Sequence, residues 1–275
     1  MITRALAILA ILLPAQDGAP KRMQSAVEKT RAQKSYSAAF SGVIKIPDSS
    51  PMELKGEVVW VSPGVLFTQY TASGGDEVRV IRVGEKVWLY HLQTEEWVPA
   101  AEAGKGGAGR GVQNPDEVLA TVIQAVGKAT SAGKVTVNDK PCDGIELKLD
   151  GDLIRKVMKE QGDASNFDWA KSSGTVRLGV GADDLIQQVR VEALIGIADP
   201  AIKDKERKAS YTAEVRVKSF NTDFSMEFSE IDPKSKKAIP IPIPARILDE
   251  IEKLKGIPDP LKAAVQKWRA KKPGG

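Results

Sequence analysis

The feature that most constrains the fold is a strict alternation of apolar and polar residues in the second half of the chain. It runs through residues 175–180, 188–192, 211–218 and 223–229. Successive side chains of a β-strand point to opposite sides of a sheet, so each of these segments has one apolar and one charged face. Strands of this kind are typical of antiparallel sheets that pack one face on a core and leave the other in water.

The first half of the chain shows the same period in shorter runs that turn residues separate. The predicted strands are residues 36–46, 54–61, 65–71, 77–83, 86–92 and 96–99, and a further hairpin is expected over 134–138 and 144–150. Ser-Pro-Gly at 62–64 and Ser-Gly-Gly at 73–75 supply turns between strands. This close spacing favours an antiparallel meander over βαβ units. We therefore expect an α+β protein whose sheet has about ten to twelve strands.

A small number of helices accompanies these strands. They are predicted over residues 20–34, 115–128, 152–160, 245–255 and 260–271. Asn114 and Pro115 suit the cap and the first position of the second helix. The Ile-Pro repeat at 239–244 lacks alternate N–H donors, so we expect it to run extended as a connector or along a sheet edge.

The N-terminus has the pattern of an export signal. Residues 1–4 are short and basic, residues 5–13 are uninterruptedly apolar, and Pro14 then breaks the run. Nine apolar residues are too few to cross a bilayer, which needs roughly 20, but they suit the apolar region of a secretory signal. We predict that residues 1–18 are a signal peptide and that the mature protein is exported, soluble and periplasmic or otherwise extracytoplasmic.

Composition excludes several kinds of chemistry. The chain has one cysteine, Cys142, and one histidine, His91, so neither a disulfide framework nor a zinc cluster built on these residue types can form. A net charge of +4 from 40 basic and 36 acidic residues does not indicate a nucleic-acid binder. The glycines at 104, 106 and 109 match a dinucleotide-binding pattern, but they follow an alanine-rich stretch, and the next helix begins several residues later. We expect no catalytic residue, no metal site and no cofactor.

The order of elements resembles a known superfamily. Lys-Ser-Tyr at 34–36 begins a strand after the first helix, and a hairpin follows with Gly-Glu-Lys-Val-Trp-Leu-Tyr at 84–90 and Thr-Glu-Glu-Trp at 94–97. Asn-Pro at 114–115 and Phe-Asp-Trp at 167–169 complete the pattern. This arrangement is similar to the LolA/LolB-like lipoprotein-carrier superfamily, which includes the mycobacterial glycolipid-binding lipoproteins.

The resemblance implies a curved antiparallel sheet, an incomplete β-barrel, with helices over its open face and an apolar cavity for acyl chains. It places this lipid-binding domain at residues 19–244 and leaves 245–275 as a C-terminal helical extension. The chain lacks the lipobox cysteine of the anchored members, which favours a shuttle over a tethered acceptor. The basic face of the last helix is a candidate contact for an envelope protein or an anionic membrane surface.

Two functions remain open from the sequence. The first is a periplasmic carrier or sensor that binds lipid or lipoprotein acyl chains, and the second is a non-catalytic structural or protein-interaction module of the cell envelope with a filled core. An exported hydrolase without a recognisable motif is the least favoured reading. The candidate cavity-wall residues are large apolar side chains on the alternating strands: Phe40, Ile44, Trp60, Phe67, Trp88, Phe224 and Phe228.

Overall fold

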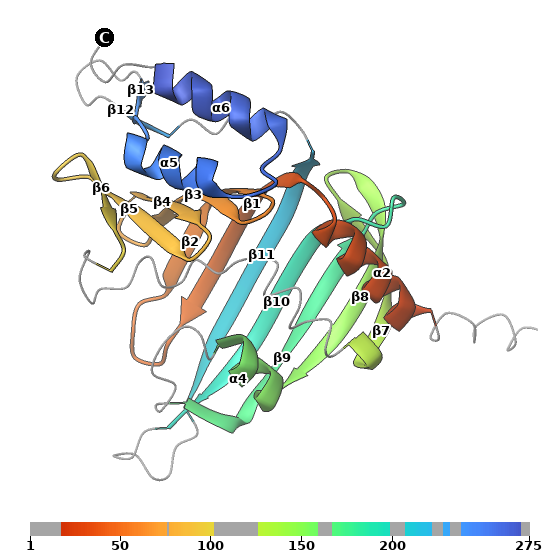
Figure 1. The fold of residues 1–275 in the computed structure, drawn as a ribbon. Coiled ribbons are helices and arrows are strands. Elements are labelled where there is room, and N and C mark those ends of the chain that lie inside the picture. Colours follow the sequence, from red (N-terminus) through yellow and green to blue (C-terminus); the bar gives the residue numbers. More distant parts are fainter. Residues whose placement is uncertain are drawn as a thin grey trace, which may run out of the picture. The chain divides into compact units, whose positions relative to one another are not determined.

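The computed structural model describes residues 18–75, 77–101, 126–158, 167–198, 207–221, 228–231 and 238–270. Its main feature is one antiparallel sheet of eleven strands in the order β6-β5-β4-β3-β2-β1-β11-β10-β9-β8-β7 (Figure 1). β6 and β7 stand at the two ends of this order, so the sheet is open. The predicted α+β class with an open antiparallel sheet is confirmed.

The strands of the large sheet overlap the predicted segments, but β7 and β9 begin at Ala129 and Phe167, well before the predicted starts at 134 and 175. Most of the predicted strand at 223–229 lies outside the described residues. The strand bounds are β1 Ser35–Lys45, β2 Met52–Val61, β3 Val65–Ala72, β4 Glu77–Val83, β5 Lys86–His91, β6 Glu96–Pro99, β7 Ala129–Val137, β8 Lys140–Asp150, β9 Phe167–Val180, β10 Ile186–Ile197 and β11 Lys208–Phe220. β12 (Ser229–Ile231) and β13 (Ala238–Pro240) form a separate two-stranded sheet. β13 holds the start of the Ile-Pro repeat, which confirms that this segment runs extended outside the large sheet.

Four α-helices and one short 3-10 helix are described. They are α2 (Ala19–Arg31), η1 (Val126–Lys128), α4 (Gly151–Met158), α5 (Ala245–Lys253) and α6 (Asp259–Ala270). None of the helices in the described ranges is long and apolar enough to cross a membrane. Of the predicted helix over 115–128, only η1 lies within the described residues, and the predicted signal peptide and the Gly-rich segment at 104–109 lie outside them.

The chain divides into two compact units. Unit 1 holds the described residues of Met1–Ala32, Gly42–Met52 and Pro115–Arg216, and unit 2 holds those of Gln33–Ser41, Glu53–Asn114 and Val217–Gly275. Strands β1 and β11 contribute to both units. Helices α5 and α6 belong to the same unit as β2–β6. The domain bounds 19–244 and 245–275 stay a prediction.

Unit 1 packs α2 and α4 on one face of β7–β10. The register pairs Leu147 with Val176 and Val176 with Val191, so these apolar side chains form one row. They meet Met23 and Val27 of α2 in a common buried core. The opposite face of the same strands is charged, as the alternation predicts.

Local interactions fix both helices of unit 1. Arg22 of α2 pairs with Asp143 at 2.8 Å and with Asp184 at 3.0 Å. Asp150 caps α4 by accepting a hydrogen bond from the Leu153 N–H at 2.9 Å. A Cβ at Gly151 would lie 1.7 Å from the Trp169 carbonyl oxygen, so only glycine fits where α4 begins.

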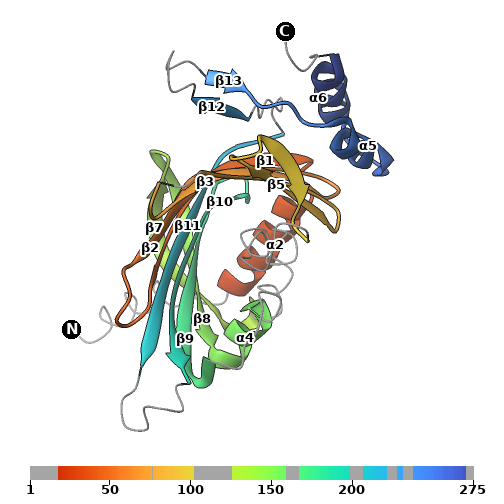
Figure 2. The ribbon, with the colours of Figure 1, turned by 90° about the vertical axis from the view of Figure 1, so that its left-hand side faces the viewer.

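Unit 2 packs the C-terminal helices on one face of β2–β5. The register aligns Val59 with Phe67, Phe67 with Ile81 and Ile81 with Trp88, so one apolar row crosses four strands. In Figure 2 this part of the chain is seen with β12, β13, α5 and α6 on one side of the strands. The row and these elements form the second buried core.

Candidate functional site

The predicted cavity-wall residues do not all line one surface of the structure. Phe67, Trp88 and Phe228 lie together in the core of unit 2, whereas Trp60 and Phe40 are not part of that cluster. Ile44 is half-buried on the part of β1 that belongs to unit 1, and Phe224 lies outside the described residues. The sequence therefore named side chains on two faces of one group of strands.

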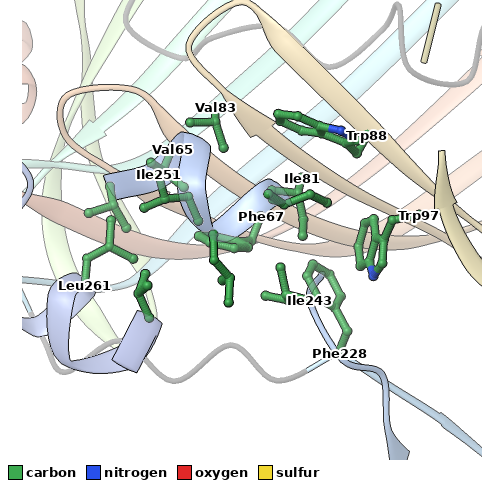
Figure 3. Close-up of a cluster of buried hydrophobic side chains, with 14 of the residues drawn as sticks. Val65, Phe67, Ile81, Val83, Trp88, Trp97, Phe228, Ile243, Ile251 and Leu261 are labelled. Carbon is green, nitrogen blue, oxygen red and sulfur yellow. The ribbon is translucent and has the colours of Figure 1, made fainter. Parts of the chain in front are cut away.

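The first face, which we call the helix-covered face, is filled by the chain itself. Its members from the sheet are Val61, Val65, Phe67, Ile81, Val83, Trp88, Tyr90 and Trp97. Figure 3 shows Phe67 and Ile81 directed toward side chains of the C-terminal segment. Ile247, Ile251, Leu261 and Val265 of α5 and α6 are each 0% exposed, so these helices are part of the core. The apolar side chains of this face are therefore covered by the chain's own helices.

Aromatic contacts join the strands to the C-terminal segment on this face. The ring of Phe67 lies 5.7 Å from that of Trp268 and 6.2 Å from that of Phe228. Trp97 meets Phe228 edge-on at 5.1 Å, a preferred geometry for aromatic pairs. The indole Nε1 of Trp97 also donates a hydrogen bond to the Pro242 carbonyl at 3.1 Å. These contacts hold the Ile-Pro connector and α6 against the sheet.

A buried arginine lies at the edge of the same face. Arg79 is 1% exposed, and its Nη2 pairs with Glu77 and donates to the Ser229 carbonyl, each at 2.6 Å. Its guanidinium carbon lies 5.7 Å from the centre of the Tyr90 ring. The charge of Arg79 is thus compensated by a carboxylate, a carbonyl dipole and an aromatic ring, which lower the cost of burying it.

The second face of these strands carries a different aromatic set. Trp60 alternates along β2 with Val59 and Val61, which belong to the helix-covered face, so its side chain points to the opposite side. Across the strand pair it faces Leu66, which is 4% exposed. Trp60 is itself only 1% exposed.

Four more rings gather near Trp60, and we call the five together the aromatic face: Tyr36, Phe40, Trp60, Tyr70 and Phe220. Tyr36 stacks on Trp60 at 5.4 Å with an interplanar angle of 22°, and its edge meets Phe220 at 6.3 Å. Phe40 lies 6.1 Å from Tyr70. All but Trp60 are half-buried, so this face is partly accessible to solvent.

The aromatic face provides apolar contact area with few polar groups. Burial raises the pKa of the Tyr70 hydroxyl above its usual range, which indicates a poorly hydrated surrounding. Tyr36 and Tyr70 were not among the predicted wall residues. The sequence could have indicated Tyr36, because it lies four residues before Phe40 in β1 and therefore on the same face of the strand. Tyr70 is found only through strand pairing.

The terminal helix is less basic than its sequence predicts. Arg269 of α6 pairs with Asp249 at 2.5 Å and with Glu252 at 2.8 Å, both on α5. Lys262 pairs with Asp259 at 2.9 Å, at the start of its own helix. A cleft in this region is lined by Glu252, Leu254, Gly256, Ile257, Lys262 and Gln266, of which three have polar side chains. The acidic side chains of α5 therefore neutralise part of the basic face.

The single histidine and the single cysteine of the chain belong to different units. His91 is exposed, and its Nδ1 lies 3.2 Å from the Thr94 hydroxyl oxygen. Cys142 is buried, and burial, followed by the charge of Asp183, raises the pKa of its thiol. Within the described ranges there is no cluster of three or more His, Cys, Asp or Glu side chains that could hold a metal ion.

Comparison with known proteins gives similarities of fold. No protein-family model and no curated sequence matches this chain. Among solved structures, it is similar to the lipoprotein LppX of Mycobacterium tuberculosis, with a TM-score of 0.48 and 10% identity over 76% of this chain and 98% of that one. It is also similar to LprF of Mycobacterium bovis, with a TM-score of 0.44 and 11% identity over 76% of this chain and 95% of that one.

A third similar structure is a LolA superfamily protein of Nitrosomonas europaea, with a TM-score of 0.29 and 9% identity over 74% of this chain and 92% of that one. Because identities are near 10% and the TM-scores are below 0.5, the role of this chain is argued from its own residues.

Proposed function

We propose that this chain is an exported carrier or sensor that binds the acyl chains of lipids or lipoproteins on the aromatic face. The observation that carries the proposal is the difference between the two faces of β2–β4. One face is filled by α5 and α6, whereas the other keeps Tyr36, Phe40 and Tyr70 half-buried around the buried Trp60. Broad rings with few polar groups suit a flexible hydrocarbon chain.

Binding by this face would be driven by the removal of methylene groups from water. Each buried CH₂ contributes about 0.8 kcal/mol, so an acyl chain supplies enough free energy for stable binding without any specific polar contact. Release then requires a partner or a membrane that offers the chain an equally apolar surrounding. The predicted signal peptide supports a role in transport across or within the cell envelope, in the periplasm or another extracytoplasmic compartment.

A non-catalytic structural or protein-interaction module of the envelope is the second candidate. The helix-covered face favours it, because three of the predicted wall residues, Phe67, Trp88 and Phe228, lie in one buried cluster with side chains of α5 and α6. In that case the same scaffold would have a filled core. Contact of α6 with an envelope protein or an anionic membrane surface remains a prediction under either function.

The proposal is tested by purifying the exported protein without detergent and analysing it by native mass spectrometry. We expect bound acylated molecules at near-unit occupancy in the wild type and strongly reduced occupancy in Phe40→Asp. The matched control is Lys255→Asp on the exposed loop after α5, which should keep its lipid. A bare wild-type mass, together with no uptake of added phospholipid, would favour the interaction module instead.

A further inference from the structure

The tip of the β1–β2 hairpin carries exposed apolar side chains. Four large apolar side chains are exposed among the described residues, and two of them, Ile46 and Met52, flank this tip, each at 47%. Between them runs Pro-Asp-Ser-Ser-Pro at 47–51, where the Ser49 N–H donates to the Ile46 carbonyl at 3.2 Å. One exposed apolar side chain is ordinary, but two on one closed turn form a small apolar surface that needs an explanation.

The ends of β9–β11 continue this surface within unit 1. Asp48 of the tip forms an ion pair with Arg207, whose carbonyl accepts a hydrogen bond from the Ile197 N–H at 2.9 Å. Ile197 of β10 pairs across to Phe167 of β9. Leu194, the third exposed apolar side chain of unit 1, lies three residues before Ile197. We call this region the hairpin end, and its exposed or half-buried apolar side chains are Ile46, Met52, Phe167, Leu194 and Ile197.

The charged residues of the hairpin end favour an anionic partner. Its cations are Lys45, Lys171, Arg207 and Lys208, and its carboxylates are Asp48 and Asp168, so four positive charges stand against two negative ones. Glu53 and Lys55, just after the tip, add one charge of each sign. Basic groups are attracted to anionic lipid headgroups, and apolar side chains beside them enter the boundary between headgroups and acyl chains. A protruding turn with both features suits a membrane surface.

We propose that the hairpin end of unit 1 docks on an anionic membrane surface, with Ile46 and Met52 inserted among the headgroups. This inference goes beyond the proposed function, because it requires no acyl chain on the aromatic face. The basic face of α6 was the predicted membrane contact, but α6 carries none of the exposed large apolar side chains of the described residues. The hairpin end combines such side chains with cations.

Vesicle flotation with the full exported protein tests the proposal. The probes are vesicles of phosphatidylglycerol and phosphatidylcholine in equal parts, and vesicles of phosphatidylcholine alone. We expect the wild type to bind the anionic vesicles roughly tenfold more tightly than the neutral ones. The double variant Ile46→Asp, Met52→Asp should bind the anionic vesicles at least roughly tenfold more weakly than the wild type. The matched control is Leu92→Asp in the β5–β6 turn of unit 2, where an equally exposed side chain should not matter.

A fluorescent label on the tip reports insertion without removing the charge or fold of the surface. An environment-sensitive dye on Met52→Cys should shift to shorter wavelength with anionic vesicles, whereas the dye on Leu92→Cys should not. The native Cys142 is buried and will not compete for the dye.

Three results would overturn the inference: equal binding to both kinds of vesicle, wild-type binding by the double variant, or a shift at position 92 alone. Absence of vesicle binding by the wild type would also overturn it. None of these results bears on the acyl-chain content in native mass spectrometry, so the proposed function is judged separately.

Discussion

The two units use their strands in different ways. In unit 1, one face of β8–β10 packs on α2 and α4, and the other is charged, with Arg177 paired to Glu146 at 2.8 Å. In unit 2, both faces of β3 and β4 are mainly apolar and largely buried, and residues Val65–Thr68 are buried in succession. A sheet with one wet face needs one cover, whereas a sheet with two apolar faces needs two.

This difference locates the candidate binding surface. Unit 1 has its apolar face covered by described helices, so its packing is explained by its own residues. Unit 2 satisfies one apolar face with α5 and α6, and its second face presents the half-buried aromatic rings. The extra apolar face is therefore the feature that a simple structural module would not need.

Removing the C-terminal helices should have the largest effect on this comparison. A chain that ends at Pro244 would expose the side chains that α5 and α6 cover. It would also lose Ile247, Ile251 and Leu261, each worth about 1.5–3 kcal/mol when buried. The sum is comparable to the whole stability of a domain, so we expect unit 2 to unfold. Near-ultraviolet circular dichroism, which reports on its tryptophans, would detect the loss, and an unchanged spectrum would contradict the role of these helices.

A pair of phenylalanine substitutions separates the two faces of unit 2. Phe67→Ala removes a fully buried ring from the helix-covered face and should lower the free energy of unfolding by about 3–5 kcal/mol. Phe40→Ala removes a half-buried ring from the aromatic face and should cost about 1–2 kcal/mol while reducing lipid content. Chemical denaturation and lipid analysis of both variants provide the test. Lipid loss in Phe67→Ala alone, at native stability, would reverse the assignment of the faces.

Acid should loosen the attachment of α2 in unit 1. A hydrogen bond from Lys29, with Arg22 adding to the effect, lowers the pKa of Asp184, and Lys134 followed by Arg22 does the same for Asp143. A carboxyl whose pKa is lowered by folding stabilises the protein above its unfolded value near 4, and this contribution is lost as the pH falls through the folded value. We expect stability to decline below about pH 4.

The control for this prediction is Asp184→Asn, which keeps the shape of the side chain and removes its charge. It should flatten the acid dependence of thermal unfolding and lower the stability at neutral pH. An unchanged acid profile in this variant would show that the ion pairs of α2 do not contribute.

The charged face of unit 1 should be the least sensitive region. Arg177→Ala breaks the pair with Glu146, but both groups are partly exposed, and such pairs contribute about 0–1 kcal/mol. We expect a change in the melting temperature of no more than a few degrees. A loss as large as that of Phe67→Ala would mean that this face is covered, and the contrast between the units would fail.

Sequence periodicity predicts most of the strands but not their partners. Alternation gives β1–β6, β8 and β11 to within about four residues, because side-chain direction along a strand is a local property, but it detects only the second half of β9 and the first half of β10. The apolar succession Val65–Phe67 also carries a signal that β3 has two buried faces. The docking of α5 and α6 on this strand depends on contacts between distant parts of the chain, such as Phe67 with Trp268, which no local pattern encodes.

The same limit explains how the candidate site was only partly predicted. The sequence predicts Phe40, Trp60, Phe67 and Trp88 alike as large apolar wall residues on alternating strands. In the structure, Phe40 and Trp60 lie on the aromatic face, whereas Phe67 and Trp88 lie on the helix-covered face. Alternation within one strand shows which of its residues share a face. It does not show which residues of the next strand lie on that same face, because this depends on the register between the strands. Pairing of Trp60 with Leu66 and of Val59 with Phe67 supplies that relation.

Photocrosslinking with a diazirine-labelled acyl chain tests the central claim most directly. The label inserts into the nearest side chain on irradiation, and fragmentation of the labelled peptides identifies the residue. The account predicts insertion at Tyr36, Phe40, Trp60 or Tyr70, the residues of the aromatic face. Insertion at Phe67, Ile81 or Trp88, with the aromatic face unlabelled, would contradict it.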